Sequence, residues 1–172
     1  MKKYITAGMV CFTLLSFFPV VSSGGDFKVT RVFDGDTIMA EGHDIVIYVL
    51  LAGIDAPEIG SLKQQPQPYA QKAQRYLEER IFSKVVDIKG YATGSFPYNY
   101  LVGEIYVNGK NVNIGMIEQG FAEVWHEKPP PGLSIAPYLD AERQAKKSRK
   151  GIWSLGDQYM SPHEWRKRYA KK

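Results

Sequence analysis

Five segments of the chain carry the pattern of hydrophobic and polar positions that is typical of β-strands. Phe27–Phe33 alternates and is rich in residues that favour strands, and Asp36–Glu41 resumes the pattern after a short polar interruption. From Ile45 to Ala52 the residues are all apolar, mostly β-branched or aromatic, which favours a fully buried strand over a helix. Val85–Tyr91 and Leu101–Val107 are predicted as two further strands.

Other segments have helical spacing or helix-end signals. The predicted helices are Tyr69–Phe82, Val112–Gln119, Tyr138–Lys150 and a short helix that a capping-box pattern opens at Ser161-Pro162-His163-Glu164. Gly120 and Gly151 end the second and third of them, because glycine adopts the left-handed backbone that follows many helices. Five strands with a helix after the third predict a small closed or nearly closed barrel.

The first 23 residues differ from the rest of the chain. Two lysines precede an apolar run from Ile5 to Val21, and small residues follow it. This pattern predicts a secretory signal peptide at 1–23, cleaved after Ser23, with an uncleaved membrane anchor as the alternative. The only cysteine, Cys11, lies within the run, so the mature chain would have neither a disulfide nor a cysteine ligand for a metal.

Charge is distributed unevenly along the chain. The 22 lysines and arginines include Lys2 and Lys3 of the leader, so its removal leaves 20 basic against 18 acidic residues, a net charge of +2. The segment Ala141–Lys172 alone contains ten basic and three acidic residues. A basic segment of this kind suits a polyanionic partner, and a solvated helix face followed by a tail is the alternative. The total length of 172 residues suits one domain.

The first candidate site is the sequence VFDGDTIMA at 32–40, in which Asp34 and Asp36 flank Gly35 between two predicted strands. Asp-Gly is common in hairpin turns, because glycine tolerates positive φ and aspartate hydrogen-bonds its own backbone. A metal or phosphate site is the other interpretation, and the turn alone does not decide between them.

A second pair of carboxylates, Asp55 and Glu58, follows the most buried strand in the sequence LLAGIDAPEIG at 50–60. We expect both to face a cleft rather than the core. If the first three strands form a meander, Asp36 lies near them, and Asp36, Asp55 and the carbonyl of Ala56 can bind a hard cation. Glu58 is then placed to accept a proton from an attacking water. A helix cap or a turn is the alternative interpretation of the DAPE sequence.

Both motifs, in this order and at this separation, resemble those of the staphylococcal nuclease family. The matching segments are VFDGDT, LLAGIDAPE, AQKAQRYLEE, NGKNVNIGMIEQGFAEV and AERQAKKSRKGIWS, and PHEWRKR resembles a tail of secreted bacterial members. The resemblance covers about 27–168. It implies an α+β fold, an OB-type five-stranded barrel with three principal helices, and Ca²⁺-dependent hydrolysis of DNA and RNA. The expected organisation is a signal peptide at 1–23, a nuclease-like domain at 24–160 and a basic C-terminal helix or tail at 161–172.

The resemblance also implies roles for individual residues. Asp36 and Asp55 match the family's Ca²⁺ carboxylates, Ala56 matches a ligand that uses its backbone carbonyl, and Asp34 matches a nearby acid. Glu58 matches the general base.

Three further residues are candidates for binding the substrate. Tyr98 matches an aromatic residue at the phosphate end of the nucleotide, and His126 falls near a position where the family stacks an aromatic ring. Lys63, on the loop after Glu58, is a candidate point charge for the phosphate.

Two expected arginines are missing. The family's phosphate-clamping positions are occupied by Leu50 and Tyr100, and no arginine lies between Arg31 and Arg75. A bidentate guanidinium stabilises the charge that develops on a phosphate, so its loss weakens catalysis.

The sequence therefore predicts an exported Ca²⁺-dependent nuclease whose activity is weakened or lost. The alternatives are a non-catalytic nucleic-acid- or protein-binding module and an envelope protein with a residual acid cluster. The expected partner is DNA or RNA, preferably single-stranded, and the expected state is a monomer without a membrane span once the leader is removed. The expected location is the exterior, periplasm or envelope of a bacterium.

Overall fold

The computed structural model describes residues 26–60, 65–95 and 99–169. Its strands are β1 Asp26–Val32, β2 Thr37–Gly42, β3 Ile45–Leu51, β4 Ile54–Asp55, β5 Val85–Gly94, β6 Tyr100–Val107, β7 Lys110–Asn111 and β8 Glu123–Val124. Its helices are α1 Ala70–Ile81, α2 Val112–Glu118, α3 Ala136–Lys147, the 3₁₀ segment η1 Gly151–Gln158, and α4 Pro162–Tyr169. In this part of the chain no helix is long and apolar enough to cross a membrane. The leader predicted at 1–23 lies outside the described residues.

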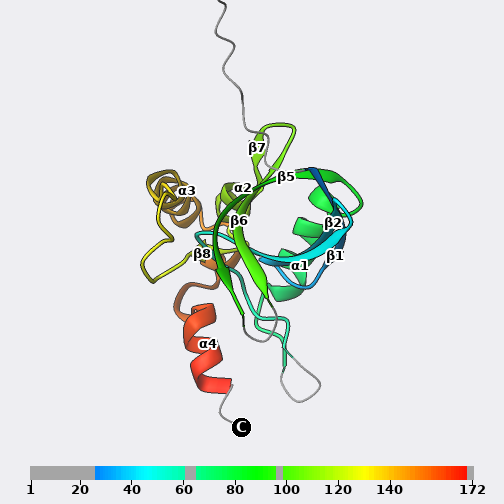
Figure 1. Cartoon of the computed structure of the whole chain (residues 1–172). Helices are drawn as coiled ribbons and strands as arrows, with labels where there is room; N and C mark the ends of the chain where they lie inside the picture. The colour runs from blue at the N-terminus through cyan, green and yellow to red at the C-terminus, as the bar shows by residue number, and fades with distance from the viewer. Residues whose placement is uncertain (1–25, 61–64, 96–98, 170–172) are drawn as a thin grey trace, which may run out of the picture.

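A closed barrel forms the centre of the fold (Figure 1). The strands pair in the order β3-β2-β1-β5-β6, and a parallel pairing between β3 and β6 closes the ring. The short strand β7 extends β6, while β4 and β8 pair separately. The predicted α+β barrel of five strands is therefore confirmed.

The predicted elements are found close to their expected bounds, with a few differences. The short strands β4, β7 and β8 and the segment η1 were not predicted, because two-residue strands and 3₁₀ turns have no recognisable period. The basic helix begins at Ala136 and ends at Lys147, earlier than expected at both ends, with Pro137 in its first turn.

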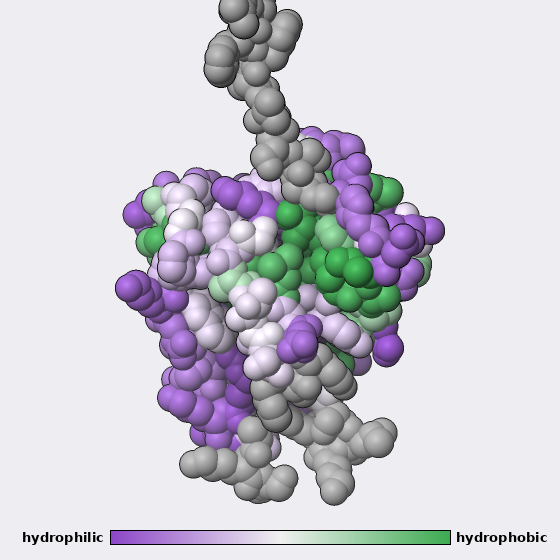
Figure 2. Space-filling model, viewed as in Figure 1, coloured by the Kyte–Doolittle hydropathy of each residue, from purple (hydrophilic) through white to green (hydrophobic). Residues whose placement is uncertain are grey.

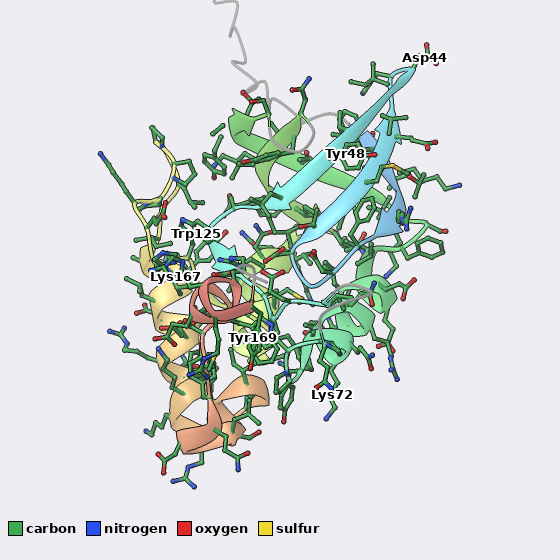
Figure 3. The ribbon with its side chains drawn as sticks, turned by 90° about the horizontal axis from the view of Figure 1, so that it is seen from below. Asp44, Tyr48, Lys72, Trp125, Lys167 and Tyr169 are labelled. Carbon is green, nitrogen blue, oxygen red and sulfur yellow. The ribbon has the colours of Figure 1, made fainter. Side chains whose placement is uncertain are left out.

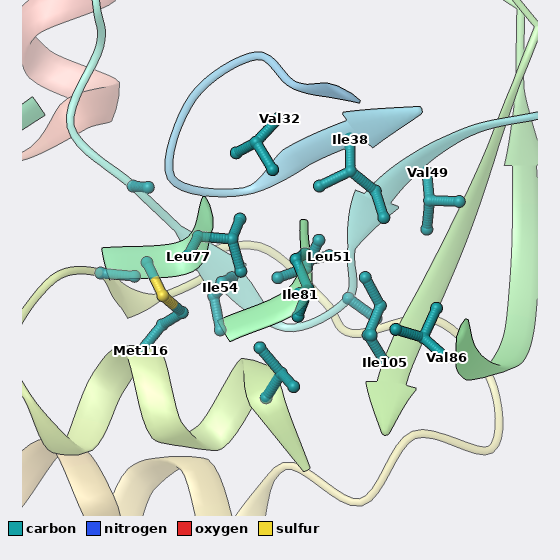
Figure 4. Close-up of a cluster of buried hydrophobic side chains, with 14 of the residues drawn as sticks. Val32, Ile38, Val49, Leu51, Ile54, Leu77, Ile81, Val86, Ile105 and Met116 are labelled. Carbon is teal, nitrogen blue, oxygen red and sulfur yellow. The ribbon is translucent and has the colours of Figure 1, made fainter. Parts of the chain in front are cut away.

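The hydrophobic core lies between the barrel and the helices (Figure 4). One face of α1 is buried, because its apolar residues recur every three or four positions as Ala70, Ala73, Leu77 and Ile81. These side chains belong to the same buried cluster as residues of the strands and of α2. The core therefore packs α1 and α2 against the strands.

A buried carboxylate, Glu104 of β6, holds the barrel against α3. Its oxygens accept hydrogen bonds from the hydroxyls of Tyr91, Tyr106 and Tyr138 and from Asn111 Nδ2, at 2.5 to 2.8 Å. Glu104 is only 6% exposed. Burial opposes its ionisation, but the four hydrogen bonds outweigh that effect and hold the pKa of Glu104 below its usual value.

Glu104→Gln is expected to lower the free energy of unfolding at pH 7 by about 1–3 kcal/mol, because a charged acceptor of four hydrogen bonds is lost. A depressed pKa stabilises the fold above the ordinary glutamate pKa of about 4.3, and the benefit is lost as the pH falls through the folded-state value. The variant should therefore lose less stability than the parent on acidification. Urea unfolding at several pH values measures both effects, with the exposed Glu79→Gln as control. Equal unfolding midpoints for parent and Glu104→Gln at pH 7 would contradict the prediction.

Candidate active site

The first turn is built by Asp34. Its Oδ1 accepts hydrogen bonds from the backbone amides of Asp36 and Thr37, at 2.9 and 2.7 Å. Gly35 does not have the positive φ expected of a hairpin glycine. Glycine is needed there for space instead, because a Cβ would come within 2.7 Å of the Ala56 Cβ and 2.9 Å of the Ala73 Cβ.

The two acidic motifs meet, as the meander predicted. Asp36 Oδ2 accepts a hydrogen bond from the Ala56 amide at 2.7 Å, and the Leu51 amide donates to the Asp36 carbonyl at 2.8 Å. Burial raises the pKa of Asp36 well above its usual value, and the nearby Asp34 and Asp55 carboxylates raise it further against the opposing Ala56 hydrogen bond. A cation bound among these carboxylates would offset the repulsion between them.

Asp55 and Glu58 come from the second acidic motif, which follows β3. Asp55 is in β4, which pairs with β8, and the loop after it carries Glu58. Gln67 fixes that loop, because its side-chain Oε1 accepts a hydrogen bond from the Glu58 backbone amide at 3.1 Å and its backbone amide donates to the Glu58 carbonyl at 2.8 Å. Burial raises the pKa of Glu58, although Arg166 lowers it in part.

The expectation that Asp55 faces an open cleft is wrong. Asp55 is 1% exposed, because the side chain of Arg166 in α4 covers it. Arg166 Nη1 and Nη2 donate to the two Asp55 oxygens, both at 2.8 Å, and Nη1 also donates to Glu58 Oε1 at 2.6 Å. Burial disfavours the charged guanidinium, but these two carboxylates outweigh it and raise the pKa of Arg166.

α4 begins at the capping box that the sequence predicted. The Glu164 amide donates to Ser161 Oγ at 3.1 Å, and the Ser161 amide donates to Glu164 Oε2 at 3.3 Å. Figure 3 shows α4 end-on, with Lys167 and Tyr169 on it and Trp125 close by. The Arg166 guanidinium lies 5.8 Å from the centroid of the Trp125 ring. The helix was predicted, but its contact with the acidic residues was not.

A family model described as "Staphylococcal nuclease homologue" matches residues 48–155 of the chain, from β3 to η1. The chain belongs to this family. Among its relatives are proteins named "Probable endonuclease LCL3". That of Schizophyllum commune is 31% identical over 147 residues, which cover 78% of this chain and 50% of the relative. That of Komagataella phaffii is 33% identical over 129 residues, 72% of this chain and 55% of the relative. That of Debaryomyces hansenii is 30% identical over 168 residues, which cover 81% of this chain and 71% of the relative. The chain thus spans about half the length of the first two relatives.

The two positions at which the resemblance predicted arginines, Leu50 and Tyr100, lie on neighbouring strands. Leu50 of β3 is partly buried and pairs with Thr37 of β2 and with Val102 of β6. Tyr100 begins β6, and its ring lies across Gly94, where a Cβ would come within 2.1 Å of Tyr100 Cζ. Among the described residues, the guanidinium that contacts the acidic group comes from α4 instead.

Of the other three candidate residues for substrate binding, the structure describes only His126. Lys63 and Tyr98 lie outside the described residues. His126 is exposed, and its ring is next to the Trp125 ring at 5.1 Å and the His163 ring at 3.8 Å, between centroids. The His163 ring therefore lies against the His126 ring, at the position where the sequence predicted base stacking.

The oxygens present fit a hard cation in type. Asp36 and Asp55 supply carboxylates and Ala56 supplies a carbonyl, which are ligands that Ca²⁺ accepts. In the described part of the chain no three His, Cys, Asp or Glu side chains are grouped as metal ligands. A cation here would therefore depend on two carboxylates, the carbonyl, and oxygens from water or substrate.

Proposed function

We propose that the protein is an exported, monomeric nuclease that hydrolyses phosphodiester bonds of DNA and RNA with Ca²⁺ as cofactor. The observation that carries the proposal is the meeting of Asp36, Asp55 and Glu58 at one end of the barrel. The relatives' names, probable endonucleases, support it. Export is inferred from the leader pattern at 1–23 alone.

In the proposed reaction Glu58 accepts the proton of a water that attacks the phosphorus, and the bond to the leaving oxygen breaks. A base in this role contributes about 10²–10⁴ in rate. Asp36, Asp55 and the Ala56 carbonyl would hold the Ca²⁺. When bound, the cation stabilises negative charge on the phosphate oxygens. The Tyr100 hydroxyl would supply at most one neutral hydrogen bond to the phosphate, a weaker contact than a guanidinium makes.

An apolar groove beside Tyr100 supports a preference for single strands. Phe27, Ile47, Tyr48, Tyr100 and Leu101 are among its lining residues. Figure 2 shows apolar surface on this face of the barrel. Unpaired bases stack on aromatic side chains whatever their sequence, whereas a duplex hides them.

The same groove favours a second candidate function, a non-catalytic module that binds nucleic acid. Neither Leu50 nor Tyr100 can clamp a phosphate with a guanidinium, and loss of one such donor typically lowers a rate by about 10²–10³. Binding through the groove needs neither arginine.

Cleavage of labelled single-stranded DNA and RNA by the purified protein tests the proposal. We expect cleavage with Ca²⁺, none with a chelator, and recovery when Ca²⁺ is added in excess. Asp36→Asn is the control, since it keeps the shape of the side chain and removes its charge. Binding of the oligonucleotides without cleavage at high protein concentration would contradict the nuclease and leave the binding module as the better description.

A further inference from the structure

The guanidinium of Arg166 lies on the two carboxylates to which the proposed function assigns the cation and the proton transfer. It engages both oxygens of Asp55 and one oxygen of Glu58. Paired, charge-assisted hydrogen bonds of this kind are roughly twice as strong as hydrogen bonds between neutral groups. In this arrangement the positive charge that faces Asp55 and Glu58 is the guanidinium of the chain's own Arg166.

The segment that carries Arg166 is attached to the loop of the candidate base. Gln67 Nε2 donates to the carbonyl of Met160, two residues before α4, at 2.8 Å. The same Gln67 side chain accepts from the Glu58 amide at 3.1 Å. Gln67 is 5% exposed, so one buried amide joins the two segments.

Two further contacts attach the segment next to Asp55. The hydroxyl of Tyr159 donates to the Glu123 carboxylate, and Glu123 of β8 pairs with Asp55 in the short sheet. The ring of His163, in the first turn of α4, lies 3.8 Å from that of His126, between centroids. Arg166 is therefore delivered by a helix docked through several residues, not by a free tail.

A hard cation and the docked Arg166 need the same carboxylate. Asp55 is 1% exposed beneath the guanidinium, and two cations on one carboxylate repel each other most strongly where water is excluded. We propose that Arg166 is an internal competitor of the cation: α4 occupies the site in the metal-free protein, and docking of α4 and binding of Ca²⁺ exclude each other. This inference rests on the proposed cation site and adds a control element within the same chain. By linkage, each event weakens the other by the same factor.

Titration calorimetry with Ca²⁺ on the full chain, without nucleic acid, tests the competition. Arg166→Ala is expected to bind Ca²⁺ about 5–150-fold more tightly than the parent, the usual range for a coupling between sites. Arg166→Gln, which keeps most of the side-chain length, should change the affinity in the same direction. Arg168→Ala removes the same charge from an exposed position of the same helix, and we expect it to change the affinity by less than about twofold.

Tryptophan fluorescence gives a second signal that does not depend on cleavage. The Arg166 guanidinium lies 5.8 Å from the Trp125 ring centroid, so undocking it changes the surroundings of that ring. Ca²⁺ should change the emission of the parent, and Arg166→Ala should lose most of that change.

Equal Ca²⁺ affinities for parent and Arg166→Ala would overturn the competition, and so would the absence of binding in both. Equal affinities with slower cleavage by Arg166→Ala would assign the guanidinium to the substrate phosphate and would also overturn it. Tighter binding by Arg166→Ala with no cleavage by either protein would support the competition and count against the proposed nuclease instead.

Discussion

Replacing Leu50 and Tyr100 together by arginine is expected to raise the rate of Ca²⁺-dependent cleavage by about 10³–10⁵. Each guanidinium on the scissile phosphate contributes about 10²–10³ in rate. The two act on the same charge, so their combined effect is smaller than the product of the single effects. Leu50 pairs with Thr37, the neighbour of Asp36, and Tyr100 begins the strand that closes the barrel against β3. The two positions therefore lie on neighbouring strands, and Leu50 lies beside the turn that carries Asp36.

The rates of the two single variants and the double variant, measured under single-turnover conditions, check this prediction. Leu139→Arg is a suitable control, because Leu139 is 44% exposed on α3 and does not line the apolar groove. It adds positive charge without reaching the site. A double variant that binds the oligonucleotide more tightly but cleaves no faster would show that the added guanidinium groups bind ground state and transition state alike, contrary to the prediction.

The meeting of the two acidic motifs could be predicted because it depends on local structure. A hairpin between β2 and β3 aligns Thr37 with Leu50, so the start of one strand necessarily lies beside the end of the other. Asp36 comes just before this pairing and Asp55 just after it. Alternation in β2 fixes which of its faces is buried, and the short connection to β3 fixes the register between the two strands.

The docking of Arg166 could not be predicted in this way. It lies 111 residues from Asp55 along the chain, and its neighbours Lys167 and Arg168 are also basic. Nothing in that run distinguishes the residue that packs on the barrel from those that face water. The choice depends on how the residues before α4, Tyr159 and Met160, contact Glu123 of β8 and Gln67, which is tertiary packing.

Gly35 illustrates a prediction that was correct in position and wrong in cause. The turn is present, and Asp34 caps it as expected. Glycine is required because Ala56 and Ala73 approach it closely, and both belong to segments remote in sequence. A pattern of turn residues reports local backbone preference and carries no information on such distant neighbours.

Glu58→Gln is expected to lower the rate of cleavage by about 10²–10⁴, because the amide cannot accept the proton of the attacking water. The substitution conserves size, and the loop should keep its shape, because Gln67 holds it through the backbone of residue 58. Stability should therefore change little. The Ca²⁺ affinity should fall little or rise slightly. Glu58 accepts a hydrogen bond from Arg166, so removal of the Glu58 charge weakens the docking of α4.

Single-turnover cleavage, thermal unfolding and Ca²⁺ titration of this variant separate the three effects. Glu127→Gln is the matched control, because its side chain is 66% exposed and pairs with His126 at the surface. A Glu58→Gln variant that cleaves within a factor of about three of the parent would show that another group takes the proton, since a true base is worth far more. A variant that is slow and also fails to bind Ca²⁺ would place Glu58 among the ligands of the cation, and the proton would then need a different acceptor among the residues around Asp36.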